Sequence, residues 1–309
     1  MSSKRNSSRH VPGMPAHTYS IVARDPNSGE MGVAVQSHWF SVGTVVSWGE
    51  AGVGVVATQS FANPAFGPDG LELLRKGASA REAARRLVDG DEGRDFRQLA
   101  ILSRKGEPFA FTGEKCVAEA GHEVGKDCSA QANMMRKNTV WHAMIDAFES
   151  TEGILAERMF AALESAQAEG GDIRGRQSAA MLVVRGEPTG KVWKDRTIDL
   201  RVEDSPDPLK ELRRLMKVQR AYESMDAGDV FVEKGQMQEA MRSYSEAERL
   251  FPQNEEMRFW VAVTLANCGK LPEARRRMRA VVRKNADWKI LLKRIGKNGV
   301  LKVDPESLL

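Results

Sequence analysis

The chain has 309 residues, of which 41% are hydrophobic and 28% charged, a balance typical of a soluble globular protein with about two domains. Its formal net charge is +4, and no apolar run approaches the ~18–20 residues of a transmembrane helix, so we expect no membrane partner. The three cysteines share no metal-ligand spacing, and the five histidines never lie two to four residues apart. This argues against a disulfide framework and a metal site, and we expect no cofactor. We also expect the protein to be cytoplasmic.

The first predicted element is a β-hairpin. Two runs rich in β-branched residues, 17–24 and 30–37, flank the turn formers Asp25-Pro26-Asn27-Ser28-Gly29. The first strand of this hairpin opens on Thr18. A threonine at the start of a strand becomes a nucleophile with its own base if cleavage exposes its α-amine.

After the hairpin, strands alternate with pairs of helices. The predicted strands are 44–48, 52–60, 98–103, 108–112, 128–134, 178–184 and 197–202. The predicted helices run through 71–74, from the capping box of Ser79 and Glu82 to about Val88, and over 138–149 and 154–168. Because strict βαβ alternation and a glycine-rich phosphate loop are absent, we expect an α+β fold in which helices cover two stacked, mostly antiparallel sheets.

The chain changes character at the proline-bearing segment 204–208, which is predicted to be a linker, because two prolines forbid a continuing strand. Beyond it everything is predicted to be helical. Gly235 and Gly269 lie 34 residues apart, as do Ala240 and Ala274, and this is the tetratricopeptide period. We therefore predict an all-α tetratricopeptide-like domain that binds a protein partner. The predicted parts are a disordered tail over 1–17, a first domain over 18–203, the linker, and the helical domain over 209–309.

Positive charge is concentrated in this helical third. From Lys210 to Leu309 there are 21 lysines and arginines against 14 aspartates and glutamates, whereas the rest of the chain holds 25 against 28. The densest basic stretch runs from Arg275 to Arg294. We interpret it as a solvated helix face, with phosphate binding as the alternative, and we do not expect a nucleic-acid partner.

Five separated strings in the first domain resemble the DUF1028 family, which is assigned to the N-terminal nucleophile (Ntn) hydrolase superfamily. They are Thr18–Asp25, Gly32–Ser37, Ala51–Ser60 with Asn63-Pro64, Phe111–Gly113 and Gly171–Ala180. The resemblance implies a four-layer αββα sandwich. It favours an Ntn-type hydrolase acting on an amide bond of a small molecule or short peptide. The alternative is a catalytically inactive binding protein on the same scaffold, and a homo-oligomer stays open.

The candidate site combines a nucleophile with groups that orient it. In this hypothesis the freed amine of Thr18 takes the hydroxyl proton, Asp172 orients that amine, and Arg174 clamps a substrate carboxylate. Hydroxyls and amides at strand ends, including the amide of Gln59, suit a small polar ligand better than a metal, although turn capping explains them equally well. The predicted catalytic residues are Thr18, Asp172 and Arg174. The predicted substrate-binding residues are Ser37, Thr58, Ser60, Asn63, Asn133 and Arg176, with Asn133 as a candidate oxyanion donor.

Overall fold

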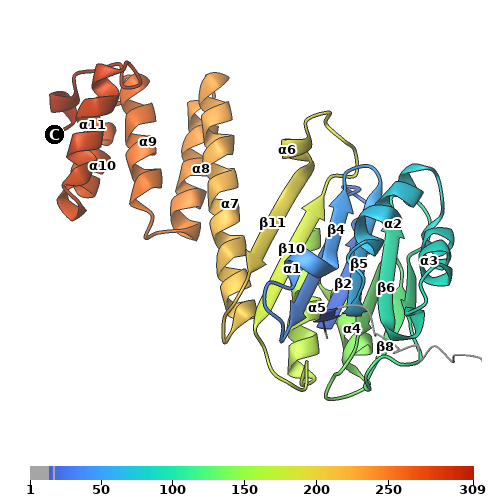
Figure 1. Ribbon diagram of the computed structural model, residues 1–309. Coiled ribbons are helices and arrows are strands. Elements are labelled where there is room, and N and C mark those ends of the chain that lie inside the picture. Colours follow the sequence, from blue (N-terminus) through green and yellow to red (C-terminus); the bar gives the residue numbers. More distant parts are fainter. Residues whose placement is uncertain (1–13, 17) are drawn as a thin grey trace, which may run out of the picture. The chain divides into compact units, whose positions relative to one another are not determined.

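The computed structural model describes residues 14–16 and 18–309 (Figure 1). The chain divides into two compact units, one ending at Arg213 and one comprising Arg214–Leu309. The first unit contains all the strands described, whereas the second contains only helices. Helix α7 (Pro208–Glu233) contributes residues to both units. Within the described ranges, no helix has the length and apolar character needed to cross a membrane.

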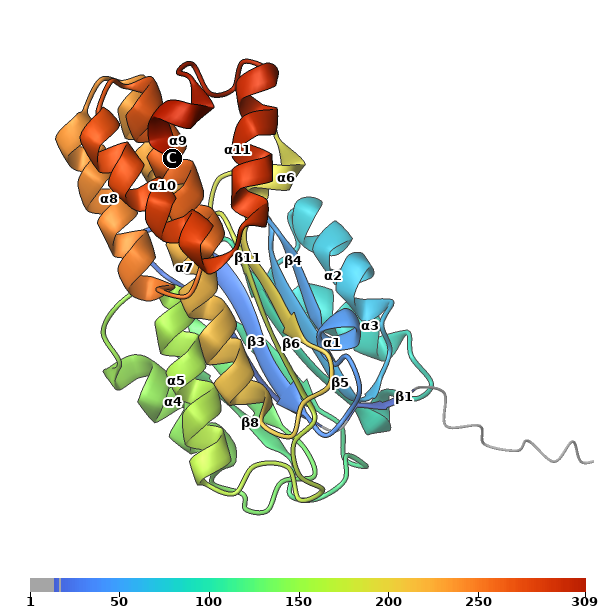
Figure 2. The same ribbon diagram turned by 90° about the vertical axis from the view of Figure 1, so that its left-hand side faces the viewer.

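Two antiparallel sheets form the centre of the first unit (Figure 2). Sheet A has the order β1-β5-β6-β7, with β4 also paired to β5, and sheet B has the order β11-β10-β3-β2-β9-β8. The strands of sheet A are β1 (Met14–Ala16), β4 (Ser47–Glu50), β5 (Gly54–Ala62), β6 (Arg97–Ser103) and β7 (Phe109–Thr112). The strands of sheet B are β2 (Thr18–Arg24), β3 (Met31–Ser37), β8 (Gly121–Gly125), β9 (Cys128–Ala132), β10 (Ser178–Val184) and β11 (Arg196–Val202). The predicted hairpin is therefore present as β2 and β3.

Helices cover the outer face of each sheet. Helices α2 (Phe66–Arg75) and α3 (Ala80–Asp89) pack on sheet A, and α4 (Val140–Ser150) and α5 (Leu155–Ala168) pack on sheet B. On the sheet A side, Leu71 of α2 joins Val56 and Ile101 in one apolar cluster. The predicted capping box of Ser79 and Glu82 is formed at the start of α3. The first unit is thus the predicted four-layer αββα sandwich.

The layer between the two sheets is apolar at one end and polar at the other. Side chains alternate between the two faces of a strand, so every second residue enters this layer. At one end Val22, Val33 and Val55 pack there without exposed surface. At the other end Ser20 Oγ of β2 donates to Gln59 Oε1 of β5 at 2.6 Å. The candidate site lies at this polar end.

The second unit repeats one helical motif. After α7 come α8 (Met237–Leu250), α9 (Glu255–Asn267), α10 (Leu271–Lys284), α11 (Asp287–Lys297) and the short 3-10 helix η2 (Pro305–Leu308). Gly235 and Gly269 end helices with φ of 74° and 79°, and after each the next amide donates to a carbonyl five residues before it. This left-handed helix end favours glycine. The 34-residue spacing of the glycines therefore corresponds to two equivalent helix ends. Ala240 and Ala274, which have the same spacing, are fully buried between helices.

Local expectations differ from the structure at three places. A strand was expected over 44–48, but α1 (Gly43–Val46) forms a helical turn and the strand begins at Ser47. Val42 N, just before this turn, donates to Ser178 Oγ at 3.1 Å, a partner far away in sequence. Strand β8 was not expected. Residues 14–16 of the predicted disordered tail form β1, whereas 1–13 and 17 lie outside the described residues.

Candidate functional site

Three hydroxyl side chains lie side by side where β2 and β10 begin and β3 ends. Thr18, the first residue of β2, pairs with Ser37, which in turn pairs with Ser178, the first residue of β10. All three residues are fully buried. Ser178 Oγ also donates to Trp39 O, so it holds the loop that leaves β3. The structure therefore brings together Thr18 and Ser37, two of the predicted site residues.

A network of buried amides holds the backbone at Thr18. The carbonyl oxygen of Thr18 accepts hydrogen bonds from Asn133 N at 3.1 Å, Asn133 Nδ2 at 3.4 Å and Gln59 Nε2 at 3.3 Å. Gln98 Oε1 accepts from Gln59 Nε2 at 2.7 Å and from Asn133 Nδ2 at 3.0 Å. Buried amides are costly when they lose partners, so this network fixes the position of the Thr18 carbonyl. Because the Asn133 amide donates to both acceptors, its geometry suits positioning better than oxyanion binding.

The candidate residues taken from the sequence omitted half of this network, namely Ser20, Gln98 and Gln131. Gln131 Nε2 donates to Ser20 Oγ at 2.6 Å, and Gln98 Nε2 donates to the carbonyl of Ala132 at 2.9 Å. Each of the three is a polar residue at an inward position of a buried strand. The alternation of inward and outward positions along each strand could have identified them. It does not say which polar residues face one another across the two sheets.

The buried Asp172 forms an ion pair with the partly exposed Arg174 beside the end of β3. Arg174 Nε lies 3.1 Å from Asp172 Oδ1 and Arg174 Nη2 lies 2.7 Å from Oδ2. The carboxylate also accepts from His38 N at 3.3 Å, and the Asp172 side chain has no exposed surface. Because two guanidinium nitrogens of Arg174 are bound to Asp172, the geometry favours a positioning pair over the predicted substrate clamp. Arg176 is exposed and lies 3.3 Å from Asp207.

Tyr19 lies on the face of β2 that packs against α5. Its hydroxyl donates to Gln36 Oε1 at 2.5 Å and lies 3.2 Å from Gln167 Oε1. Burial raises the pKa of Tyr19 well above its ordinary value, and the negative charge of Asp172 raises it further. Tyr19 therefore stays a neutral phenol at physiological pH and supports the site as a hydrogen-bond donor.

Thr58 and Asn63 cap a turn on the opposite face of β5 from Gln59. Thr58 Oγ1 donates to Asn63 O at 3.2 Å, and Asn63 Oδ1 accepts from Ala65 N at 3.2 Å. These contacts agree with the alternative interpretation, in which Thr58 and Asn63 cap a turn. The structure does not bring Thr58 and Asn63 into the amide network around Thr18.

Ser60 follows Gln59 with a φ of 68°, a left-handed conformation that is uncommon for a residue other than glycine. It is fully buried and pairs with Arg97, which is ion-paired to Asp91 at 2.7 Å. Burial opposes ionisation of Asp91, but hydrogen bonds from Arg97 and Gly93 hold its pKa below the ordinary value. Burial also raises the pKa of the Cys116 thiol near Ser60.

Known proteins resemble this first unit in sequence and in fold. A model described as a family of unknown function, DUF1028, matches residues 18–212. The chain belongs to the DUF1028 family. A crystal structure of protein SPO2555 from Silicibacter pomeroyi, also assigned to DUF1028, is 31% identical, with a TM-score of 0.60. The match covers 65% of this chain and 85% of that chain.

The second unit also has a known relationship, because a tetratricopeptide repeat model matches residues 231–295. Both resemblances predicted from the sequence are therefore confirmed. No curated protein matches the chain.

The site of this DUF1028 domain is closed. Thr18, Ser37, Ser60 and Asn133 have no exposed surface. Strand β1 pairs with the end of β5, with Ala16 opposite Ser60, immediately before the chain enters β2. As it stands, the domain therefore presents Thr18 to no substrate. Among the residues described, no group of three or more His, Cys, Asp and Glu side chains is arranged to hold a metal ion.

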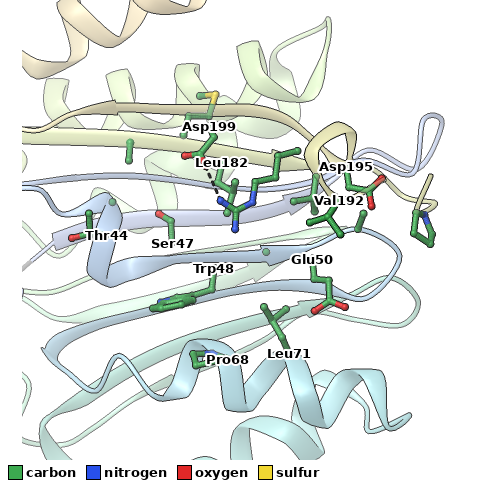
Figure 3. Close-up of a pocket in the computed structure, with 18 of the residues that line it drawn as sticks. Thr44, Ser47, Trp48, Glu50, Pro68, Leu71, Leu182, Val192, Asp195 and Asp199 are labelled. Atoms are coloured by element: carbon green, nitrogen blue, oxygen red, sulfur yellow. Dashed lines mark hydrogen bonds and ion pairs between the residues drawn. The ribbon is translucent and has the colours of Figure 1, made fainter. Parts of the chain in front are cut away.

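A separate cleft of about 680 Å³ opens elsewhere in the DUF1028 domain, between β4 and α2 on one side and β10 and β11 on the other (Figure 3). Trp48, Pro68 and Leu71 line one wall (Figure 3). On the other wall Asp199 Oδ2 accepts from Arg196 Nη1 at 2.8 Å. None of the predicted site residues lines this cleft. Its two walls come from segments that are far apart in the sequence.

Proposed function

We propose that the DUF1028 domain is an N-terminal-nucleophile hydrolase that cleaves an amide bond of a small molecule or short peptide once Thr18 becomes the first residue. The observation that carries this proposal is the placement of Thr18 at the first position of β2, between the sheets, with its carbonyl held by Gln59 and Asn133. The family match also begins at residue 18. A nucleophile needs this kind of rigid support to reach near-attack geometry.

The chemistry depends on the nitrogen of Thr18. While residue 17 is attached, this nitrogen is a planar amide whose lone pair is delocalised, so it cannot act as a base. A free α-amine has a pKa of about 7.7–8.0 and accepts the hydroxyl proton near neutral pH. Thr18 Oγ then attacks the substrate carbonyl carbon, the C–N bond breaks, and the proton passes to the leaving amine. Water hydrolyses the resulting ester and regenerates Thr18.

A binding protein on the same scaffold is the second candidate. The closed site favours it, because Thr18 is fully buried and Asp172 is already bound by Arg174. In both candidates the second unit serves as the partner-binding part, since stacked helical repeats present extended surfaces to other proteins.

The two candidates differ in what removal of residues 1–17 does. We expect a form that begins at Thr18, released from a cleavable fusion, to hydrolyse members of an amide and dipeptide library about 100-fold faster than the full chain. Mass spectrometry of the native protein should show loss of residues 1–17.

Thr18→Ser and Thr18→Ala serve as the matched pair, because serine keeps the hydroxyl that alanine lacks. Activity that survives in Thr18→Ser and disappears in Thr18→Ala supports the hydrolase. Equal activity of the full and trimmed chains would exclude the amine as the base. An inactive trimmed chain that still binds a library member would favour the binding protein.

A further inference from the structure

A groove of about 680 Å³ runs along α10 beside α11 in the second unit. Five basic side chains line it: Arg275, Arg276, Arg279 and Arg283 of α10 and Lys289 of α11. All five are exposed. Apolar atoms of Val282 and Leu309 also line the groove. The groove therefore combines a strong positive charge with an apolar surface.

Most of this charge has no acidic partner among the residues described. Arg276 lies 3.6 Å from Glu273, and Glu306 is bound to Lys293 rather than to Lys289. In residues 18–309, no Asp or Glu side chain forms an ion pair with Arg275, Arg279, Arg283 or Lys289. Like charges four residues apart destabilise a helix. A bound anion would relieve that repulsion along α10.

The same face of α10 already holds a length of peptide chain. Arg275 Nε donates to Ser307 O at 2.7 Å, and Arg279 Nε donates to Leu309 O. Leu308 between them is fully buried. Arg275 thus binds a peptide carbonyl and Arg279 binds an oxygen of the last residue of the sequence. Their remaining guanidinium nitrogens are available to a second segment in the groove.

The spacing of the arginines suits an extended peptide. Arg275, Arg279 and Arg283 are four residues apart, which is about 6 Å along a helix axis. Alternate side chains of an extended chain project to one side every ~6.6 Å. Acidic side chains at every second position would therefore meet successive arginines, whereas the side chains between them would point to the opposite side of the peptide.

We propose that this groove binds an extended acidic segment of a partner protein, with carboxylates at alternate positions against the α10 arginines and Lys289. A peptide is favoured over a single-stranded nucleic acid, because none of the residues lining the groove is aromatic and base stacking has no platform. This inference rests on the proposal that the second unit binds a protein. It is independent of any hydrolase activity at Thr18.

The test is a fluorescence anisotropy titration of the full-length chain with a labelled peptide of about eight residues, in which glutamate alternates with leucine or alanine. A matched peptide carries glutamine in place of each glutamate. We expect the acidic peptide to bind at least about tenfold more tightly than the glutamine peptide, and its affinity to fall as salt rises.

Arg283→Glu and Lys289→Glu each reverse one charge in the groove, and Lys234→Glu makes the same change in the exposed turn between α7 and α8. We expect about tenfold weaker peptide binding for each groove variant and less than about a twofold change for Lys234→Glu. Using two groove variants guards against a failure of one to fold. Equal weakening in all three variants, or equal binding of the two peptides, would overturn the proposal. Tighter binding of a single-stranded RNA of similar length would assign the groove to nucleic acid instead.

Discussion

Replacing Gln98 by leucine tests whether the buried amide network stabilises the sandwich. Leucine nearly matches glutamine in volume, so the substitution removes hydrogen bonds without opening a cavity. The donors and acceptors around Gln98 are Thr112 Oγ1 at 2.8 Å, Gly121 O at 3.1 Å, Ala132 O at 2.9 Å, Gln59 Nε2 at 2.7 Å and Asn133 Nδ2 at 3.0 Å. Each buried polar group left without a partner costs about 1–3 kcal/mol. Because Gln59, Asn133 and Thr112 each keep another partner, we expect a loss of about 3 kcal/mol rather than the full sum.

Urea unfolding followed by tryptophan fluorescence measures this loss. With a slope of about 2–3 kcal/mol per molar urea, the midpoint for Gln98→Leu should fall by about 1–1.5 M. Gln253→Leu is the control, since Gln253 is exposed between α8 and α9 and its free energy of unfolding should change by less than about 0.5 kcal/mol. If Gln98→Leu unfolds at the same urea concentration as this control and the unmodified chain, the network does not stabilise the fold and the reasoning is refuted.

Three further predictions concern other contacts in the first unit. Ser79→Ala removes the capping box of α3 and should lower the free energy of unfolding by about 1 kcal/mol in the same urea assay. Asp91→Asn removes the negative charge that binds the buried Arg97 and should cost about 3 kcal/mol at pH 7. Because the pKa of Asp91 is depressed in the folded chain, its contribution is present above the unfolded pKa and should shrink as pH falls toward 3, which denaturation at several pH values measures. Burial raises the pKa of Cys128 from 9.0 to about 12, so the thiol of the unfolded chain ionises first. The free energy of unfolding should therefore fall by roughly 1 kcal/mol between pH 8 and 10, and urea unfolding of Cys128→Ala at both pH values should show a smaller fall.

Much of the fold could be predicted because its signals are local. The β-branched runs around Asp25-Pro26-Asn27-Ser28-Gly29 specify a hairpin, since strand propensity and turn formers act over a few residues. Ser79 and Glu82 specify a helix start through contacts three residues apart. The spacing of Gly235 and Gly269 indicates repeated helix pairs, because each glycine adopts the same left-handed conformation at a helix end.

The candidate site was predictable only in part. Thr18 was chosen as a candidate because it begins a strand, and Asp172 because it lies in a turn that precedes one. Thr58 and Asn63 were placed in the site by the same reasoning, but the structure gives them turn contacts on the other face of β5. A strand end identifies a position along the chain and not the face on which a side chain acts.

Tertiary structure alone decided which polar groups meet. Val42, the residue just before the helical turn Gly43–Val46, donates its amide hydrogen to Ser178, which lies 136 residues later in the sequence. Gln59 and Gln98 lie 39 residues apart and meet only because β5 and β6 are neighbours in one sheet. Hydrogen bonds and ion pairs of this kind depend on distances of about 3 Å between groups remote in sequence, which no local pattern encodes. The sequence by itself determined most of the strands and helices and the helical repeat, whereas the packing of the two sheets determined the buried network at Thr18.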